Sequence, residues 1–429
     1  MPLALPLNQV ARRAGLATSL LLAAALRPAV AQVAVPISWV AAAPTTLGRS
    51  ESQGVGVGNK VYVMGGFYDT SLQVTLNGEV YDVTTDTWAP MANMPEGITH
   101  SGTAEDGNNL YLAGGYVGQA PGAITDHVWR YNIPTNTWSA MPPLPGARGA
   151  GIIVRLGREL HFYGGAIRVG GTVVRDTPDH WALNLDAPLP AWTVRAPLPV
   201  ATNHLGGAAL NGKIYAIGGQ LLGDEDFGNQ SSIYEYDPTA NAWTAKAPMP
   251  RALGHTANSV CVLNNRIVVI GGRLNGPAIA GQVVEFNPAA NSWRDLTPLP
   301  LPLLAPVAAV AGGRLIINGG YDGLHPTVTS TWRSSLVLGS RPAQHLPAAL
   351  ALWPNPSTGR GVSLTVDTPQ SGACAVQISN ALGQDQQSLT FSKPAGAFRH
   401  DLTVALRPGV YSVALRQGSY YAVQKLVVN

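Results

Sequence analysis

Short apolar runs that end in a pair of glycines recur along the chain. One example is Val61-Tyr62-Val63-Met64-Gly65-Gly66. The six pairs begin at Gly65, Gly114, Gly164, Gly218, Gly271 and Gly319, so that successive pairs lie 49, 50, 54, 53 and 48 residues apart. Apolar runs of this length, bounded by turn residues, are typical of buried strands. The pattern predicts a repeated strand unit.

Six tryptophans form a second series with nearly the same period. They are Trp39, Trp88, Trp138, Trp192, Trp243 and Trp293, spaced by 49, 50, 54, 51 and 50 residues. Between each glycine pair and the next tryptophan come a loop, an aromatic or apolar strand such as residues 128–132, and a turn that suits Asn and Asp. Each unit therefore supplies four strands, and two independent markers with one period argue against chance.

Composition supports short strands over helices. The 429 residues include 48 Gly and 34 Pro, and only 12% are charged. Gly costs about 1 kcal/mol and Pro about 3 kcal/mol in a helix interior. Lys and Arg outnumber Asp and Glu by only 27 to 24, without a basic run, which argues against a nucleic-acid partner.

The repeat resembles the kelch motif in its Gly-Gly pair, its Tyr-bearing third strand, its turn to Trp, and an Arg or His after a Pro-rich connector. The resemblance covers residues 36–339. It implies an all-β fold, a six-bladed β-propeller. Because the Trp39 strand precedes the first glycine pair and no Trp strand follows the last, we expect it to complete the blade built from residues 305–337 and so close the ring.

The N-terminus has the three parts of a secretory signal peptide: Arg12 and Arg13, an uncharged stretch over residues 14–26, and Ala29-Val30-Ala31. We expect cleavage after Ala31, so that residues 1–31 are removed. The stretch is shorter than the about 20 residues that span a bilayer, and no later segment qualifies. The sequence thus predicts a secreted protein without a transmembrane segment.

Residues 340–347 break the period and are expected to be a linker. Short alternating strands follow in residues 348–429 and predict a small antiparallel β-sandwich. Four local motifs occur in order: Leu352-Trp353-Pro354-Asn355-Pro356, then residues 378–384, residues 406–413 and the terminal residues 424–428. In these motifs the segment resembles the type A sorting domain of type IX secretion, although Trp353 stands where that family usually has Tyr or Phe. The resemblance implies an interaction with the type IX machinery and release at, or attachment to, the cell surface. A plain accessory sandwich is the alternative. The sorting-motif residues are Pro354, Asn355, Pro356, Gly409, Tyr411 and Lys425.

Strand order also predicts which loops share a face. In a four-stranded blade, the loops between the second and third strands and the connectors between blades emerge on the same side, which here carries the long insertions. Loops on a rigid scaffold commonly hold binding sites. Aromatic side chains there suit a sugar face or a protein interface. The candidate ligand-binding residues are Phe67, Tyr68, Tyr116, Arg168, Phe227 and Tyr321.

Other residues offer chemistry with weaker support. His100, His204 and His255 recur after the connectors and could converge on a metal. The kelch pattern carries His or Arg there, with Arg49 and Arg148 nearby, so a structural role is favoured and no metal or cofactor is predicted. The acidic residues 224–226 are better explained as a solvated loop than as a Ca²⁺ site. Cys261 and Cys374 are expected to be small apolar core residues.

The function favoured by the sequence is a binding module for an extracellular carbohydrate or protein, with no catalytic residue assigned. The alternative is an extracellular carbohydrate-active enzyme with its site at the propeller mouth, because kelch propellers include a copper oxidase and a sialic-acid epimerase. The apolar surroundings of Cys261 argue against an oxidase. For an epimerase, Glu51, Glu105, Glu159, Arg168 and Arg175 are the side chains that could reach the ring. Fold alone does not decide between these functions.

Overall fold

The protein is described from a computed structural model. It covers residues 37–170, 173–223, 227–335, 344–345, 350–358, 361–368, 371–380, 385–402, 406–417 and 420–429. The predicted signal peptide, residues 1–31, and the acidic residues 224–226 lie outside these ranges. Throughout the described ranges the secondary structure is β, as predicted, and none of it is a helix that could cross a bilayer.

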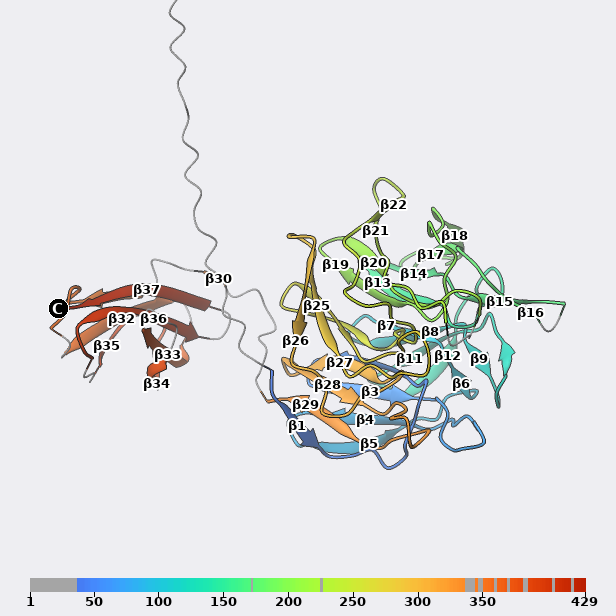
Figure 1. The fold of residues 1–429 in the computed structure, drawn as a ribbon, viewed down its shortest axis with the longest axis horizontal. Coiled ribbons are helices and arrows are strands. Elements are labelled where there is room, and N and C mark those ends of the chain that lie inside the picture. The colour runs from blue at the N-terminus through green and yellow to red at the C-terminus, as the bar shows by residue number, and fades with distance from the viewer. Residues whose placement is uncertain are drawn as a thin grey trace, which may run out of the picture. The chain divides into compact units, whose positions relative to one another are not determined.

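Six four-stranded antiparallel sheets in the described residues form the blades of a propeller (Figure 1). Their number equals that of the glycine pairs. Blade 1 holds β2 (Gln53–Val57), β3 (Lys60–Met64), β4 (Gly78–Asp82) and β5 (Thr87–Met91); blade 2 holds β7 (Gly102–Glu105), β8 (Asn109–Ala113), β11 (Val128–Asn132) and β12 (Thr137–Ala140); blade 3 holds β13 (Ile152–Leu156), β14 (Glu159–Tyr163), β17 (His180–Asn184) and β18 (Trp192–Val194). Blade 4 holds β19 (Gly206–Leu210), β20 (Lys213–Ile217), β21 (Ile233–Asp237) and β22 (Ala242–Ala245); blade 5 holds β23 (Val260–Leu263), β24 (Arg266–Ile270), β25 (Val283–Asn287) and β26 (Ser292–Leu296); blade 6 holds β27 (Val307–Ala311), β28 (Arg314–Asn318), β29 (Thr331–Ser334) and β1 (Trp39–Ala42).

The ring closes through the first described strand. Strand β1 pairs antiparallel with β29, with Trp39 opposite Ser334, which is the pairing that the order of the markers predicts. The innermost strands β2, β7, β13, β19, β23 and β27 lie next to one another in this order, and β27 lies next to β2. Blade 6 is therefore made from both ends of the propeller segment, and β1 supplies the backbone hydrogen-bond partners for the outer side of β29.

The glycine pairs lie where neighbouring blades meet and allow the backbone to pass there. Gly65 and Gly66 have φ values of +60° and +85°, in the left-handed region that disfavours a side chain. A Cβ on Gly66 would also lie 2.7 Å from the carbonyl oxygen of Ser50. The Gly66 N–H donates to the Ile98 carbonyl at 3.0 Å, and the equivalent bond at the closing junction runs from Gly320 to Arg49 at 2.7 Å. The pairs thus allow a backbone bond between blades.

The tryptophans join each blade to the connector before it. The Trp88 indole N–H donates to the Ala43 carbonyl at 2.7 Å, and that of Trp39 donates to Thr297 at 3.1 Å. Equivalent bonds are made by Trp138, Trp192, Trp243 and Trp293. Buried apolar clusters fill all six wedges between neighbouring blades. The core is therefore divided among the interfaces of the ring rather than gathered in one centre.

Two of the long loops contain additional strands. Strands β9 (Tyr116–Val117) and β10 (Ala123–Ile124) pair with each other, and β6 (Ile98–Thr99) extends them. Strands β15 (Ala166–Val169) and β16 (Val173–Asp176) form a separate hairpin. The sequence predicted loops here, and the added pairing stiffens this face.

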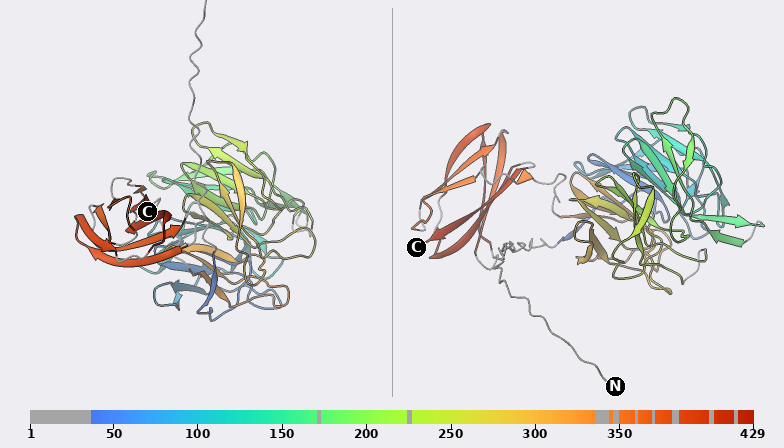
Figure 2. Two further views of the ribbon diagram at one scale, coloured as in Figure 1. Left: turned by 60° about the vertical axis from the view of Figure 1, so that its left-hand side comes forward. Right: turned by 90° about the horizontal axis from the view of Figure 1, so that it is seen from above.

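The C-terminal segment forms two sheets, seen from two sides in Figure 2 in orange and red. One sheet has the order β30-β37-β36-β33-β34 and the other β31-β32-β35. Their bounds are β30 (Gln344–His345), β31 (Leu350–Trp353), β32 (Val362–Thr368), β33 (Gly372–Asn380), β34 (Asp385–Lys393), β35 (Gly396–Leu402), β36 (Gly409–Gln417) and β37 (Tyr420–Val428). A continuous apolar core that includes Cys374 lies between them. The expected linker 340–347 includes β30, which pairs in parallel with β37.

Candidate functional site

One backbone position in every blade connection adopts a left-handed conformation. It lies just before the innermost strand, and its six residues are Glu51, His100, Ala150, His204, His255 and Ala305, with φ values of 49°, 54°, 53°, 49°, 54° and 48°. Because the six segments converge around the ring, side chains at this position face a common centre. Four of the six positions carry an imidazole or a carboxylate, and two carry alanine.

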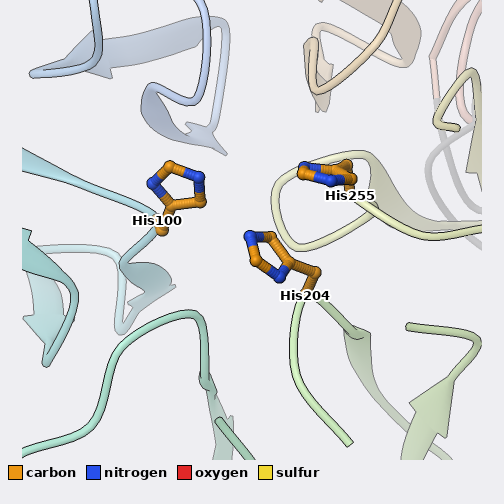
Figure 3. Close-up of side chains that lie close together, drawn as sticks. All are labelled: His100, His204 and His255. Carbon is orange, nitrogen blue, oxygen red and sulfur yellow. The ribbon is translucent and has the colours of Figure 1, made fainter. Parts of the chain in front are cut away.

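The three histidines meet although they come from three different blade connections (Figure 3). The ring centroid of His204 lies 4.3 Å from that of His255 and 5.0 Å from that of His100. One nitrogen from each ring lies within 4.8 Å of the other two. The exposed fractions are 10% for the His100 side chain and 3% and 5% for His204 and His255, so the cluster is almost entirely buried.

Glu51 completes the cluster. One carboxylate oxygen lies 2.7 Å from Nδ1 of His255, and the other lies 3.6 Å from Nε2 of His100. Burial alone would raise the pKa of Glu51, but the imidazoles of His100, His255 and His204 outweigh it and lower the pKa to about 2. The carboxylate is therefore ionised at neutral pH and gives the cluster a fixed negative charge.

The surroundings hold these side chains in place. Nδ1 of His204 bonds to the side-chain oxygen of Asn203. Close by in the sequence, the Asn258 side chain donates to the Ser101 carbonyl at 3.1 Å and accepts from the Thr103 hydroxyl at 3.3 Å, which joins blade 5 to blade 2. The cluster thus lies within a rigid frame at the centre of the ring.

Two of the predicted ligand-binding residues lie against this cluster. The Phe67 ring packs edge-on to His100 at 5.8 Å, and the Tyr116 ring packs edge-on to the same imidazole at 5.3 Å. Both residues directly follow a glycine pair. Phe67 is 9% exposed, so it forms part of the wall of the mouth more than an open stacking surface.

The other four predicted residues lie on the surrounding loops, here called the rim. Phe227 is 68% and Tyr68 37% exposed. Arg168 donates to the Pro121 carbonyl at 2.7 Å, and the Tyr321 hydroxyl donates to the Gly323 carbonyl at 3.1 Å. The structure thus divides the predicted set into Phe67 and Tyr116 beside the cluster and four residues on the rim.

Hydrogen bonds join the rim loops at five of the six junctions between blades in the described residues. Asn229 N–H donates to the Asn275 side chain at 2.9 Å, and the Leu222 N–H donates to the Asp176 carboxylate at 2.8 Å. Three other junctions pair Gln119 with Ser71, Arg168 with Pro121, and Thr327 with Tyr68. The rim loops therefore support one another.

The three glutamates considered for an epimerase-like site do not converge. Glu105 and Glu159 lie at the turns between the first and second strands of their blades, at the opposite end from Glu51 and the histidines. Glu159 pairs there with Arg195 at 3.1 Å. Glu51 alone among the three glutamates joins the histidines. Its position in the repeat, equivalent to theirs, is the signal in the sequence that could have linked Glu51 to the histidines.

The histidines also occupy a different position from the nearby arginines. Arg49 and Arg148 lie two residues before Glu51 and Ala150. Arg49 is buried and pairs with Glu79 at 2.5 Å, and Arg148 pairs with Asp179 and lies over the Trp181 ring. The arginines and the histidines therefore occupy two different positions of the repeat, so the structural role of the arginines does not extend to the histidines.

In the C-terminal domain, the sorting-motif residues anchor the last strand. The Asn355 side chain donates to the Lys425 carbonyl at 2.6 Å and accepts from the Val427 N–H at 2.9 Å. Pro354 and Pro356 flank this asparagine. Tyr411 is 7% exposed, and its hydroxyl donates to the Arg407 carbonyl at 2.8 Å just before β36, which begins at Gly409. The motif therefore ties the start of the domain to its end.

Comparison with known proteins supports both parts. Models of the kelch motif match residues 48–95, 99–145, 201–250 and 254–300, which correspond to blades 1, 2, 4 and 5. A model described as the secretion system C-terminal sorting domain matches residues 351–429.

Similar curated proteins are also kelch proteins. Kelch-like protein terF of Aspergillus terreus is 26% identical over 67% of this chain and 66% of its own length. Kelch-like protein 23 of Pongo abelii is 27% identical over 53% of this chain and 38% of its own, and a kelch repeat-containing protein of Arabidopsis thaliana is 25% identical over 58% and 61%. The chain thus covers less than two thirds of each relative. It is a kelch-repeat protein with a type IX secretion C-terminal sorting domain.

Proposed function

We propose that the propeller is an exported binding module that holds a protein ligand against its rim. The sorting domain indicates export through type IX secretion, to the cell surface or the medium. The proposal rests on one observation above all: large apolar side chains are exposed on the rim loops. Leu324 is 85%, Leu222 76%, Phe227 68%, Val169 45% and Leu72 39% exposed.

Exposed apolar side chains gathered on one face are typical of a protein interface. The contacts between rim loops reduce the ordering that binding would require, which favours affinity. Most of the exposed rim residues are aliphatic. A sugar ring stacks best on an open aromatic face, and Phe67, an aromatic residue of the mouth, is buried. These features favour a protein ligand over a glycan.

The test compares rim and edge substitutions. A Leu222→Ser/Phe227→Ser/Leu324→Ser variant should bind the partner at least tenfold more weakly, equivalent to about 1.4 kcal/mol. The partner would be isolated by crosslinking secreted and surface proteins to the intact chain. The control is Leu189→Ser, because Leu189 is 89% exposed but lies in the turn between β17 and β18. Equal affinity for both variants would contradict the proposal.

Two further outcomes discriminate among ligands. Specific retention on a glycan array, abolished by Tyr68→Ala but not by the rim triple variant, would replace the protein ligand with a carbohydrate. Product formation from a sugar substrate would favour the alternative of an extracellular carbohydrate-active enzyme. Export is tested separately: a chain that lacks residues 344–429 should stay inside a host that has type IX secretion.

A further inference from the structure

The cluster at the centre of the ring is chemically unusual for its backbone position. A non-glycine residue in the left-handed region costs roughly 1–2 kcal/mol, and Ala150 and Ala305 show that alanine occupies the same position in two blades. The fold therefore does not require histidine or glutamate there. Their presence at four of six equivalent positions, with the side chains brought together, indicates a role for the side chains themselves.

The donor set matches a transition metal. Three imidazoles and one carboxylate are ligands that Zn²⁺ takes in proteins. Metal–nitrogen bonds of about 2.0–2.1 Å place two ligand atoms about 3.4 Å apart in a tetrahedral site and at most about 4.2 Å apart in any geometry. The three histidines offer nitrogens within 4.8 Å of one another, so a contraction of the order of 1 Å would bring them to ligand spacing.

Hydrogen bonds orient two of the rings. Glu51 bonds to Nδ1 of His255 at 2.7 Å, and Asn203 bonds to Nδ1 of His204. In metal sites, such a bond to one ring nitrogen fixes the orientation of the imidazole and makes the other nitrogen a stronger ligand. A carboxylate beside the rings also balances part of the charge of a divalent ion.

We infer that His100, His204 and His255 bind one divalent transition-metal ion, with Zn²⁺ the best fit, and that Glu51 orients His255 and balances the charge. The site lies at the centre of the ring, beside Phe67 and Tyr116. It is separate from the exposed rim residues proposed to bind protein, so either proposal can fail alone.

The experiment measures metal binding by the intact chain, purified without a polyhistidine tag and stripped with a chelator. Calorimetric titration with ZnCl₂ should give one tight equivalent, and elemental analysis after dialysis should give the same stoichiometry. Co²⁺ in its place should show the visible absorption of a four-coordinate site, with three imidazoles and a water as ligands. His204→Ala and His255→Ala should each weaken Zn²⁺ binding by about 100-fold or more, and Glu51→Gln by about 10–100-fold.

The substitutions are matched to the fold, because alanine already occupies the equivalent position in two blades. The thermal unfolding of each metal-free variant, followed by circular dichroism, checks that it folds. His325→Ala is the control: His325 is 69% exposed on the rim and pairs with Asp322, and its loss should leave binding unchanged. A wild-type chain without a tight equivalent, or tight binding that survives in His204→Ala and His255→Ala, would overturn the inference.

Discussion

At the scale of single residues, blade 3 contains a buried histidine pair. Nδ1 of His161 lies 3.0 Å from Nε2 of His180, and the two residues are 0% and 1% exposed. Burial lowers the pKa of His161 to about 4 and that of His180 to about 3, with a smaller effect from Arg195 on both. Glu159 and Tyr236 also face the pair. Both rings are therefore neutral in the folded protein near pH 7.

This pair should make the protein sensitive to acid. The unfolded chain binds protons at the ordinary pKa near 6.5, whereas the folded chain does not, so stability falls as the pH drops from about 6.5 toward 4. The loss at pH 4 should be on the order of 3 kcal/mol per histidine. Urea denaturation at pH 7.5, 6, 5 and 4 measures it.

A double variant tests the assignment. His161→Val/His180→Val copies blade 5, which has Val268 and Val283 at the equivalent strand positions. Its unfolding free energy should change less between pH 7.5 and 4 than that of the wild type. Parallel pH profiles for the two proteins would show that other groups cause the acid sensitivity.

At the scale of the elements, the glycine pairs combine two constraints that can be separated. Gly66 and Gly107 have similar φ values of +85° and +88°. A Cβ on Gly66 meets Ser50 and Ser52 within 3 Å, whereas a Cβ on Gly107 meets nothing within 4 Å. The first position thus carries both a backbone and a packing requirement, and the second carries the backbone requirement alone.

Gly66→Ala should therefore destabilise the protein more than Gly107→Ala. Both substitutions pay the backbone cost of roughly 1–2 kcal/mol. The crowding at Gly66 should add about 1–3 kcal/mol, because the backbone at Ser50 and Ser52, which leads into β2, must shift. Chemical denaturation of both variants gives the difference, and equal losses of stability would show that the close approach to Ser50 and Ser52 is not limiting.

The sorting domain has an element-scale test of its own. Asn355→Ala removes two hydrogen bonds to the backbone of β37, each worth about 0.5–1.5 kcal/mol. The unfolding transition of the C-terminal domain should move to a lower temperature in calorimetry, while the propeller transition stays in place. A shift of the propeller transition instead would contradict this assignment.

At the scale of the whole molecule, the ring depends on the strand that joins its two ends. Trp39 is half-buried, packs in the wedge between blades 5 and 6, and bonds to Thr297. Trp39→Ala should lower the free energy of unfolding by about 2 kcal/mol, less than the 3–5 kcal/mol typical of a fully buried tryptophan.

Val40→Ala is the control in the same strand, because Val40 is 42% exposed and should change stability by no more than about 0.5 kcal/mol. Urea denaturation distinguishes the two variants. If Trp39→Ala were as stable as Val40→Ala, the closing strand would contribute little to the ring.

The repeat, its period and the face of the long loops could be predicted because each depends on local features. A glycine pair is required at a left-handed turn, and a tryptophan reaches the connector just before its own blade. These features recur at one spacing, so the sequence displays them directly. The sorting motif was also predictable, because its residues occur in a fixed order.

The central cluster could not be predicted as a unit. Glu51 and His255 are 204 positions apart, and the ring alone brings them within hydrogen-bonding distance. The burial of His161 and His180 also depends on tertiary structure, because both rings pack against Tyr236 of blade 4. The sequence by itself determined the blades and their order, because those follow from short-range chemistry. The tertiary structure decided which polar side chains meet, because ring closure places distant segments around one centre.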